Sequence, residues 1–248
     1  AAPGDSPNGT SADNFETTPD ALTYDPVTRT VTISGNCTTD QMFDFVHEGG
    51  AGENVKYVHF SGASTIQTLI PVPDDPDDPQ PFVGVGPFFE KYDIEGITAD
   101  PNASVSFVGK NSRLAPVLTS FFNDCSSLAN IDGLSVWDVS NVTGPFCMQH
   151  MFAGCLNLAS LDALAFWNVS KVNGDACMQS MFQYCESLTS LSGISSWDVS
   201  NVAGAKCMQN AFHACTQLTS LDALASWNIG GALASTDGLS DMFWTDTN

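Results

Sequence analysis

The chain has 248 residues, and its 28 Asp and Glu against 7 Lys and Arg give a formal net charge of −21. This balance excludes nucleic acid and anionic membrane surfaces as partners, because phosphate binding depends on Lys and Arg that release counterions. Hydrophobic residues make up 43% of the chain, which is enough for a buried core. No apolar run approaches the roughly 20 residues of a membrane span, so we expect a folded protein that does not insert into a membrane.

The first 20 residues are rich in Pro, Gly, Ser and Asp. They carry neither the basic start nor the apolar stretch of a signal peptide. We predict that residues 1–20 form a flexible lead-in, at the head of a mature secreted chain or of an expressed fragment.

Residues 21–119 have no clean sequence period. Alternating apolar and polar residues predict strands at 30–34, 55–60 and 104–108. Helical patterns predict helices at 38–47, with a cap, and at 116–123. We interpret this part as irregular coils that cap a larger stack, because an exposed end of a repeat array needs covering.

A proline-rich acidic stretch, Pro71 to Pro81, interrupts these coils. Its four carboxylates are oxygen ligands of the kind that calcium prefers: Asp74, Asp75, Asp77 and Asp78. However, the residue order of a calcium-binding loop is absent and the interleaved prolines stiffen the chain. We therefore expect a solvated acidic loop and no metal site.

From Ser120 onward the chain repeats with a period of 30 residues. Two residue types mark the period: Trp137, Trp167, Trp197 and Trp227, and Cys125, Cys155, Cys185 and Cys215. Apolar residues within a unit are spaced by two or three positions, which matches neither an amphipathic helix nor an alternating strand. One unit cannot bury its apolar edge alone, whereas stacked units share a continuous core. We predict an α/β repeat solenoid, with four 30-residue repeats in residues 120–248 and the last one divergent or truncated.

Each repeat is expected to contain a short helix and a short parallel strand. In the second unit the helix is predicted at 148–154 and the strand at 158–164, followed by a turn at 167–170. Polar side chains that recur in this turn are expected to bond nearby backbone amides: Asp138, Asn168, Asp198 and Asn228.

The pattern M-F-x-x-C-x-x-L-x-x-L followed by W-D-V-S-N-V resembles the BspA-like, leucine-rich-repeat-like surface proteins of bacteria, from about Ser120 to Phe243. The resemblance implies a leucine-rich-repeat-like solenoid, secreted or wall-attached, that acts as an adhesin. Two features depart from the family pattern. Three units insert three residues and an added cysteine before the Met, and the last unit has Asp237 in place of that cysteine and stops soon after Trp244. The chain is therefore expected to end inside or just past a terminal coil.

Eight cysteines occur without any C-x-x-C pair, which favours a disulfide framework over zinc or thioredoxin-type sites and indicates a compartment outside the reducing cytosol. A bond between Cys147 and Cys155 would cross about 12 Å of intact helix, which is beyond disulfide reach. A broken helix would restore that option. We favour three bonds that each close a 22-residue step: Cys125 with Cys147, Cys155 with Cys177, and Cys185 with Cys207. Cys37 and Cys215 are then left over as free thiols.

Nothing in the sequence indicates catalysis or a cofactor. The four histidines do not recur at equivalent repeat positions, and no nucleophile, metal or phosphate-binding motif accompanies them. His150 and His213 lie near cysteines and are interpreted as surface positions. We expect a protein that is not an enzyme.

The predicted solenoid presents a long regular face, which repeat proteins use for protein recognition. Positions that vary between units are the candidate contacts: Val136 and Phe166 in one column, and Phe146 and Lys206 in another. We expect a monomeric extracellular or cell-surface protein that recognises a host or neighbouring-cell surface protein. The alternative is a passive rigid spacer in a longer surface protein, because most variable positions carry Ser, Ala or Thr rather than aromatic or Arg anchors.

Overall fold

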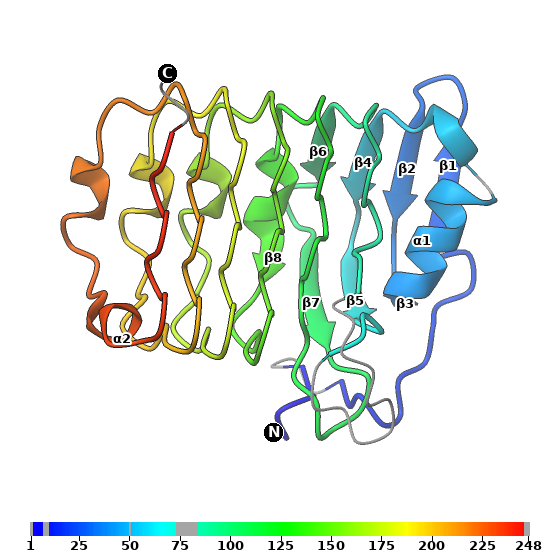
Figure 1. The fold of residues 1–248 in the computed structure, drawn as a ribbon. Helices are drawn as coiled ribbons and strands as arrows, with labels where there is room; N and C mark the ends of the chain where they lie inside the picture. Colours follow the sequence, from blue (N-terminus) through cyan, green and yellow to red (C-terminus); the bar gives the residue numbers. More distant parts are fainter. Residues whose placement is uncertain (1, 7–9, 50, 73–83, 246–248) are drawn as a thin grey trace.

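The computed structural model describes residues 2–6, 10–49, 51–72 and 84–245, in which the chain winds into successive coils that lie side by side (Figure 1). The strands of the earlier coils form two four-stranded sheets, in the orders β1-β2-β4-β6 and β3-β5-β7-β8. Every strand pairing is parallel except that of β1 with β2. The fold is therefore mixed α/β, with parallel sheets and little helix.

The first sheet joins β1 (Leu22–Asp25), β2 (Thr30–Ile33), β4 (Tyr57–Phe60) and β6 (Gly96–Ala99). Its register places Val31 beside Val58 and Val58 beside Ile97. All three side chains are fully buried. Parallel strands in register thus bring equivalent apolar residues of successive coils together, as expected for a shared core.

The second sheet joins β3 (Cys37–Thr38), β5 (Ala63–Gln67), β7 (Ser104–Val108) and β8 (Trp137–Asp138). Its register places Val105 beside Trp137. The rings of Phe60, Phe107 and Phe121 surround that indole edge-on, at centroid distances of 5.0–5.6 Å. This aromatic cluster joins the strand-containing coils to the repeats that follow.

Helix α1 (Thr39–His47) covers the amino-terminal end of the stack (Figure 1). Thr38 and Gln41 form a capping box, with hydrogen bonds of 3.1 and 3.0 Å between each side chain and the other residue's backbone N–H. Met42 and Val46 pack into the core. The remaining helices are short: η1 (Gly52–Asn54), η2 (Asp132–Val136), η3 (Asp162–Leu164), η4 (Ser192–Ile194), η5 (Asp222–Leu224) and α2 (Gly230–Leu233).

The predicted strands at 30–34, 55–60 and 104–108 and the capped helix at 38–47 are confirmed as β2, β4, β7 and α1. The predicted helix at 116–123 is wrong, because this segment is a series of turns with Ser120 at a φ of 52°. The coils before residue 119 are also more regular than expected, since their strands pair in register. Short strands with few alternating residues, such as β1 and β6, gave no clear pattern in the sequence.

The predicted repeat helix at 148–154 is also wrong. This segment is a row of turns in which every fourth residue has a left-handed φ: 60° at Phe146, 54° at His150 and 74° at Gly154. The expected strand at 158–164 is replaced by an irregular stretch followed by the 3-10 helix η3. A helix would satisfy its backbone N–H groups internally, whereas here alternate N–H groups bond to the next coil.

Along the rows of turns, the backbone hydrogen bonds between neighbouring coils run in one direction. Met148 N–H donates to the Cys177 carbonyl, and Met178 N–H donates to the Cys207 carbonyl, both at 2.8 Å. The same pattern recurs at alternate residues from Leu118 to Ala214, always from the earlier coil to the later one. We call these bonds the backbone ladder.

Side chains repeat the ladder in the core. Phenylalanine rings stack at 5.5 Å between neighbouring coils: Phe88, Phe122, Phe152, Phe182, Phe212 and Phe243. The four indoles stack at 6.0–6.4 Å and within 5° of parallel. Trp167 Nε1–H donates to the Leu134 carbonyl at 2.8 Å, and Trp197 and Trp227 repeat this bond one coil further on.

The expected flexible lead-in instead contacts the body of the protein. Gly4 N–H donates to the Ser112 carbonyl at 3.3 Å, and Asn141 Nδ2–H donates to the Asp5 carbonyl at 3.0 Å. Asp13 accepts a hydrogen bond from the Ser112 N–H at 2.9 Å. The polar lead-in thus supplies partners for backbone and side-chain groups near residues 109–112 and 141.

Trp137 differs from the other indoles, because its buried Nε1–H has no hydrogen-bond acceptor among the described residues. We therefore expect Trp167→Phe to destabilise the protein more than Trp137→Phe, by about 1 kcal/mol, since only the former removes an indole hydrogen bond and leaves a buried carbonyl without that donor. Urea unfolding of both variants measures the difference. Equal losses would contradict a stabilising role for the indole hydrogen bond.

Candidate functional site

Phe166 is the most exposed large hydrophobic residue among the described residues, with 93% of its surface accessible. It follows η3 and lies between two core residues, Leu164 and Trp167, which are 0% and 4% exposed. The short 3-10 helix turns those neighbours inward and leaves the Phe166 ring in solvent. The sequence-based choice of Phe166 as a surface residue agrees with this geometry.

The other members of the column lie on adjacent coils. Ser196 Oγ–H donates to the Ala165 carbonyl at 3.3 Å, and Ser226 Oγ–H donates to the Ser195 carbonyl at 3.1 Å. Both serines are exposed, whereas Val136 is half-buried and packs against the core. The column therefore presents one projecting aromatic ring followed by a serine-lined surface, and we call it the Phe166 column.

The second predicted column lies in the row of turns, a different part of each coil. Phe146 is half-buried, its N–H donates to the Asp175 carbonyl at 2.9 Å, and its own carbonyl accepts from Thr119 Oγ–H at 2.6 Å. Lys206 is exposed and has a left-handed φ of 59°. The backbone of both residues bonds to the next coil, since Lys206 N–H donates to the Thr236 carbonyl at 2.8 Å. The two differ in exposure, and of the pair only Lys206 is an exposed surface position.

The predicted disulfides are not formed. All eight cysteines lie in the described part of the chain, and all are buried free thiols. One set of thiols donates to the carbonyls of Phe88, Phe122, Phe152 and Phe182 at 3.1–3.4 Å: Cys125, Cys155, Cys185 and Cys215. The second set points to carbonyls of the following coil at 3.8–3.9 Å: Cys147, Cys177 and Cys207.

The stacking of the coils explains why the predicted cysteine pairs do not form. Equivalent cysteines of neighbouring coils lie near one another. Cys155 has Cys125 and Cys185 as neighbours, and Cys177 has Cys147 and Cys207. The proposed pairs would instead join the two sets. Burial raises the pKa of Cys147 and of Cys215 to about 12, which keeps both as unreactive thiols at neutral pH.

Two histidine assignments also need revision. His213 is only 7% exposed and stacks against Trp244 at 5.0 Å, so it is not a surface position. His150 is half-buried. Within the described ranges, no group of three or more His, Cys, Asp or Glu side chains is placed to hold a metal ion. The acidic stretch at Asp74 to Asp78 lies outside the described residues.

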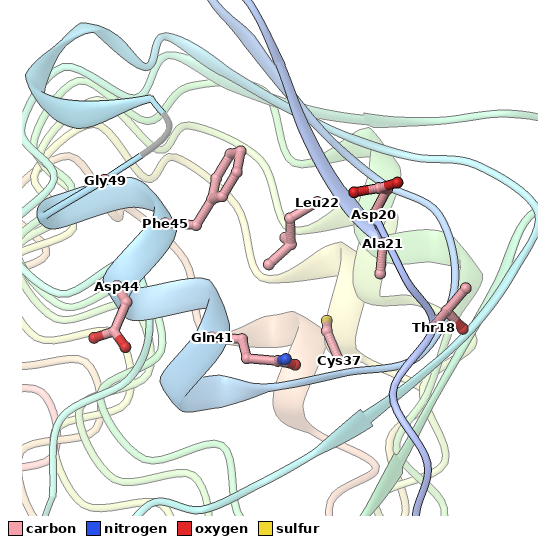
Figure 2. A pocket seen from close by; sticks show the side chains of 9 residues that line it. All are labelled: Thr18, Asp20, Ala21, Leu22, Cys37, Gln41, Asp44, Phe45 and Gly49. Atoms are coloured by element: carbon pink, nitrogen blue, oxygen red, sulfur yellow. The ribbon is translucent and has the colours of Figure 1, made fainter.

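A hollow that the residue patterns did not reveal lies between α1 and β1 (Figure 2). It has a volume of about 390 Å³ and draws its lining from three segments that are separate in sequence: residues 18–22, Cys37, and residues 41–49. The sequence hinted at an acidic site only through the composition of the first 55 residues, which include nine Asp and Glu against one Arg. That composition does not reveal which carboxylates share a cavity.

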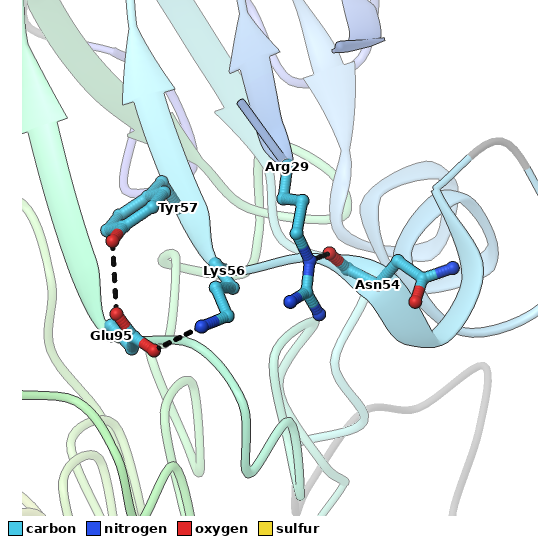
Figure 3. A network of polar contacts seen from close by, with 5 residues as sticks. All are labelled: Arg29, Asn54, Lys56, Tyr57 and Glu95. Atoms are coloured by element: carbon cyan, nitrogen blue, oxygen red, sulfur yellow. Dashed lines mark hydrogen bonds and ion pairs between the residues drawn. The ribbon is translucent and has the colours of Figure 1, made fainter. Parts of the chain in front are cut away.

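Two basic residues, Arg29 and Lys56, make polar contacts where strands β2 and β4 of the first sheet begin (Figure 3). Lys56 Nζ lies 2.8 Å from Glu95 Oε1, and the Tyr57 hydroxyl donates to Glu95 Oε2 at 3.0 Å. Arg29 Nε–H donates to the Asn54 carbonyl at 2.7 Å. The hydrogen bonds from Lys56 and Tyr57 lower the pKa of Glu95. This network joins neighbouring coils.

Among the described helices, none has both the length and the apolar character needed to cross a membrane.

The free thiols predict a labelling result. Without reductant, all eight cysteines should resist alkylation in the folded protein, because they are buried, and all eight should react in concentrated urea. Mass spectrometry of the intact protein counts the alkylated sites. A chain that accepts only two labels in urea would support the three disulfides instead.

The raised thiol pKa values also predict alkaline destabilisation. Burial raises the pKa of Cys37, Cys147 and Cys215 to about 12, whereas an unfolded thiol titrates near about 8.5. The folded state therefore retains protons that the unfolded state loses, and the free energy of unfolding should fall as the pH rises from about 8.5 towards 12. Urea unfolding at pH 7.5 and pH 9.5 checks this, and Cys215→Ala should flatten the dependence. A pH-independent stability would contradict the assignment.

Comparison with known proteins gives one result. Residues 117–247, just over half of the chain, match the family described as "Mycoplasma protein of unknown function, DUF285". Neither the curated proteins nor the solved structures gave a match. The matched range corresponds closely to the coils joined by the backbone ladder.

Proposed function

Since the chain belongs to the DUF285 family, we propose that it is a leucine-rich-repeat-like solenoid that recognises another protein through one face of its stacked coils. The recognition surface is the Phe166 column. The partner is a surface protein of a host or of a neighbouring cell, and the protein acts outside the cell or at its surface, as a BspA-like adhesin. It performs no catalytic step, needs no cofactor and acts as a monomer.

The exposure of Phe166 carries this proposal. Leaving a phenylalanine side chain in water forgoes about 2 kcal/mol of hydrophobic stabilisation. The equivalent residues in the next two repeats are Ser196 and Ser226, so the coil itself does not require an aromatic residue there. Exposed aromatic residues that enter a partner's pocket supply much of the affinity at protein interfaces. Recognition gives the Phe166 ring a role that folding does not.

The scaffold beneath Phe166 is ordered, which reduces the cost of binding. Trp167 is anchored by its hydrogen bond to the Leu134 carbonyl and by stacking with Trp137 and Trp197. The backbone beside Phe166 therefore loses little freedom when a partner covers the ring. The net charge of −21 further favours a partner surface that is not strongly acidic.

The free thiols are compatible with an oxidising environment. Cysteine oxidation requires access and thiolate character, and burial denies both to these residues. Extracellular location therefore rests on the resemblance of the repeat motif and no longer on predicted disulfides.

The alternative function is a passive rigid spacer. The serine-lined part of the Phe166 column supports it, because Ser196 and Ser226 use their hydroxyls to bond the preceding coil. The continuous backbone ladder would resist bending in that role. The two functions differ in whether Phe166 contacts anything.

Substitution of Phe166 by serine distinguishes the two functions. Phe166→Ser introduces the residue found in the next two coils, so the melting temperature should stay within a few degrees of the wild type. Protein captured from surface extracts by the immobilised wild type should fall at least about tenfold with this variant, which is a typical loss for an aromatic anchor.

Val27→Ser is the matched control, because Val27 is 88% exposed and lies far along the sequence from the column. Capture by Val27→Ser should equal that by the wild type. If Phe166→Ser captures the same proteins in the same amounts as the control, Phe166 is not a contact and the spacer function is favoured.

A further inference from the structure

The hollow between α1 and β1 combines an apolar interior with acidic edges. Leu22 and Phe45 reach into it from opposite sides, the first from the strand and the second from the helix (Figure 2). Both side chains are half-buried and pack partly against the core. A volume of about 390 Å³ lies within the range of small-ligand sites, roughly 300–1,000 Å³.

Two carboxylates complete the lining. Asp20 belongs to the segment that enters β1, whereas Asp44 lies on α1, so the two charges come from opposite walls. Neither Lys nor Arg lines the hollow. Arg29, the one Lys or Arg among the first 55 residues, hydrogen-bonds to the Asn54 carbonyl. The local field therefore favours a cation.

The floor of the hollow holds a polar group without a partner. Cys37 is 1% exposed, and its sulfur points towards the hollow (Figure 2). The other seven thiols each donate to a backbone carbonyl, whereas Cys37 forms no hydrogen bond with any described residue. A ligand in the hollow would supply a neighbour for this thiol. Burial raises the pKa of Cys37 to about 12, so the thiol contributes packing rather than a nucleophile.

We propose that this hollow binds an organic cation with an apolar stem, placing the stem between Leu22 and Phe45 above Cys37 and the charged group beside Asp20 or Asp44. The chemistry fits an alkylammonium group, which is present in free diamines and in lysine side chains of peptides. A metal ion is disfavoured, because half of the lining is apolar and the carboxylates lie on opposite walls. The site is separate from the Phe166 column and does not depend on recognition there.

The test is a titration of the full chain, monitored by the methyl NMR signals of Leu22. The probe 1,5-diaminopentane should shift these signals in a saturable and salt-sensitive way, whereas 1,5-pentanediol, which has the same length without charge, should not. The peptide Ac-Ala-Lys-Ala-NH2 separates the two sources of the cation. Its binding indicates a lysine side chain, and binding of the diamine alone indicates a free amine.

Asp20→Asn or Asp44→Asn, at whichever carboxylate the charged group lies, should weaken diamine binding by about fivefold, as expected for loss of one partly exposed ion pair. Glu16→Gln is the control, because it removes the same charge from an exposed residue that does not line the hollow. Effects of Asp20→Asn and Asp44→Asn that are both no larger than that of Glu16→Gln would reduce the interaction to general charge attraction and overturn the site. So would equal shifts with diamine and diol, or no shift of Leu22 with the diamine.

Discussion

The backbone ladder is the interaction on which the rest of the structure depends. Each bond joins residues about 30 positions apart, so it forms only when a whole coil has the right length and register. This explains why the row of turns is not helical. A helix would use the same N–H groups internally and leave the coils without their main connection. Left-handed residues at every fourth position turn those groups outward.

Side-chain order follows from the same register. Because successive coils are aligned, the core phenylalanines, the repeat tryptophans and the repeat cysteines each lie beside their equivalents in the next coil. The amide of Gln149 likewise donates to Gln179, and Gln179 to Gln209, both at 2.6 Å. Equivalent cysteines thus form two separate rows rather than mixed pairs. Each thiol in these two rows has a carbonyl acceptor.

The sequence predicted those features that depend on local pattern. The period of 30, the inward tryptophans and the capped helix at Thr38 are all visible in residue spacing, and Asp138 and Asn168 accept turn hydrogen bonds as expected. What it missed depends on long-range pairing. The segment 148–154 has helix-forming residues, but its alternate N–H groups donate to carbonyls of the neighbouring coil. The hollow beside α1 was also invisible, because its lining comes from three separate segments. The surface position of Phe166 could be predicted, because the equivalent residues of the next two repeats are serines.

The single direction of the backbone ladder has an electrical consequence. Alternate peptide groups in four successive rows point their N–H bonds towards the later coils, so their dipoles add along the stack instead of cancelling as in an ordinary sheet. The later coils carry the positive pole, as the amino-terminal end does in an α-helix. Asp237 and Asp241 occupy left-handed positions of the last described row, at a φ of 53° each. Two acidic residues of this chain therefore belong to the row at the positive pole of its own array of peptide groups.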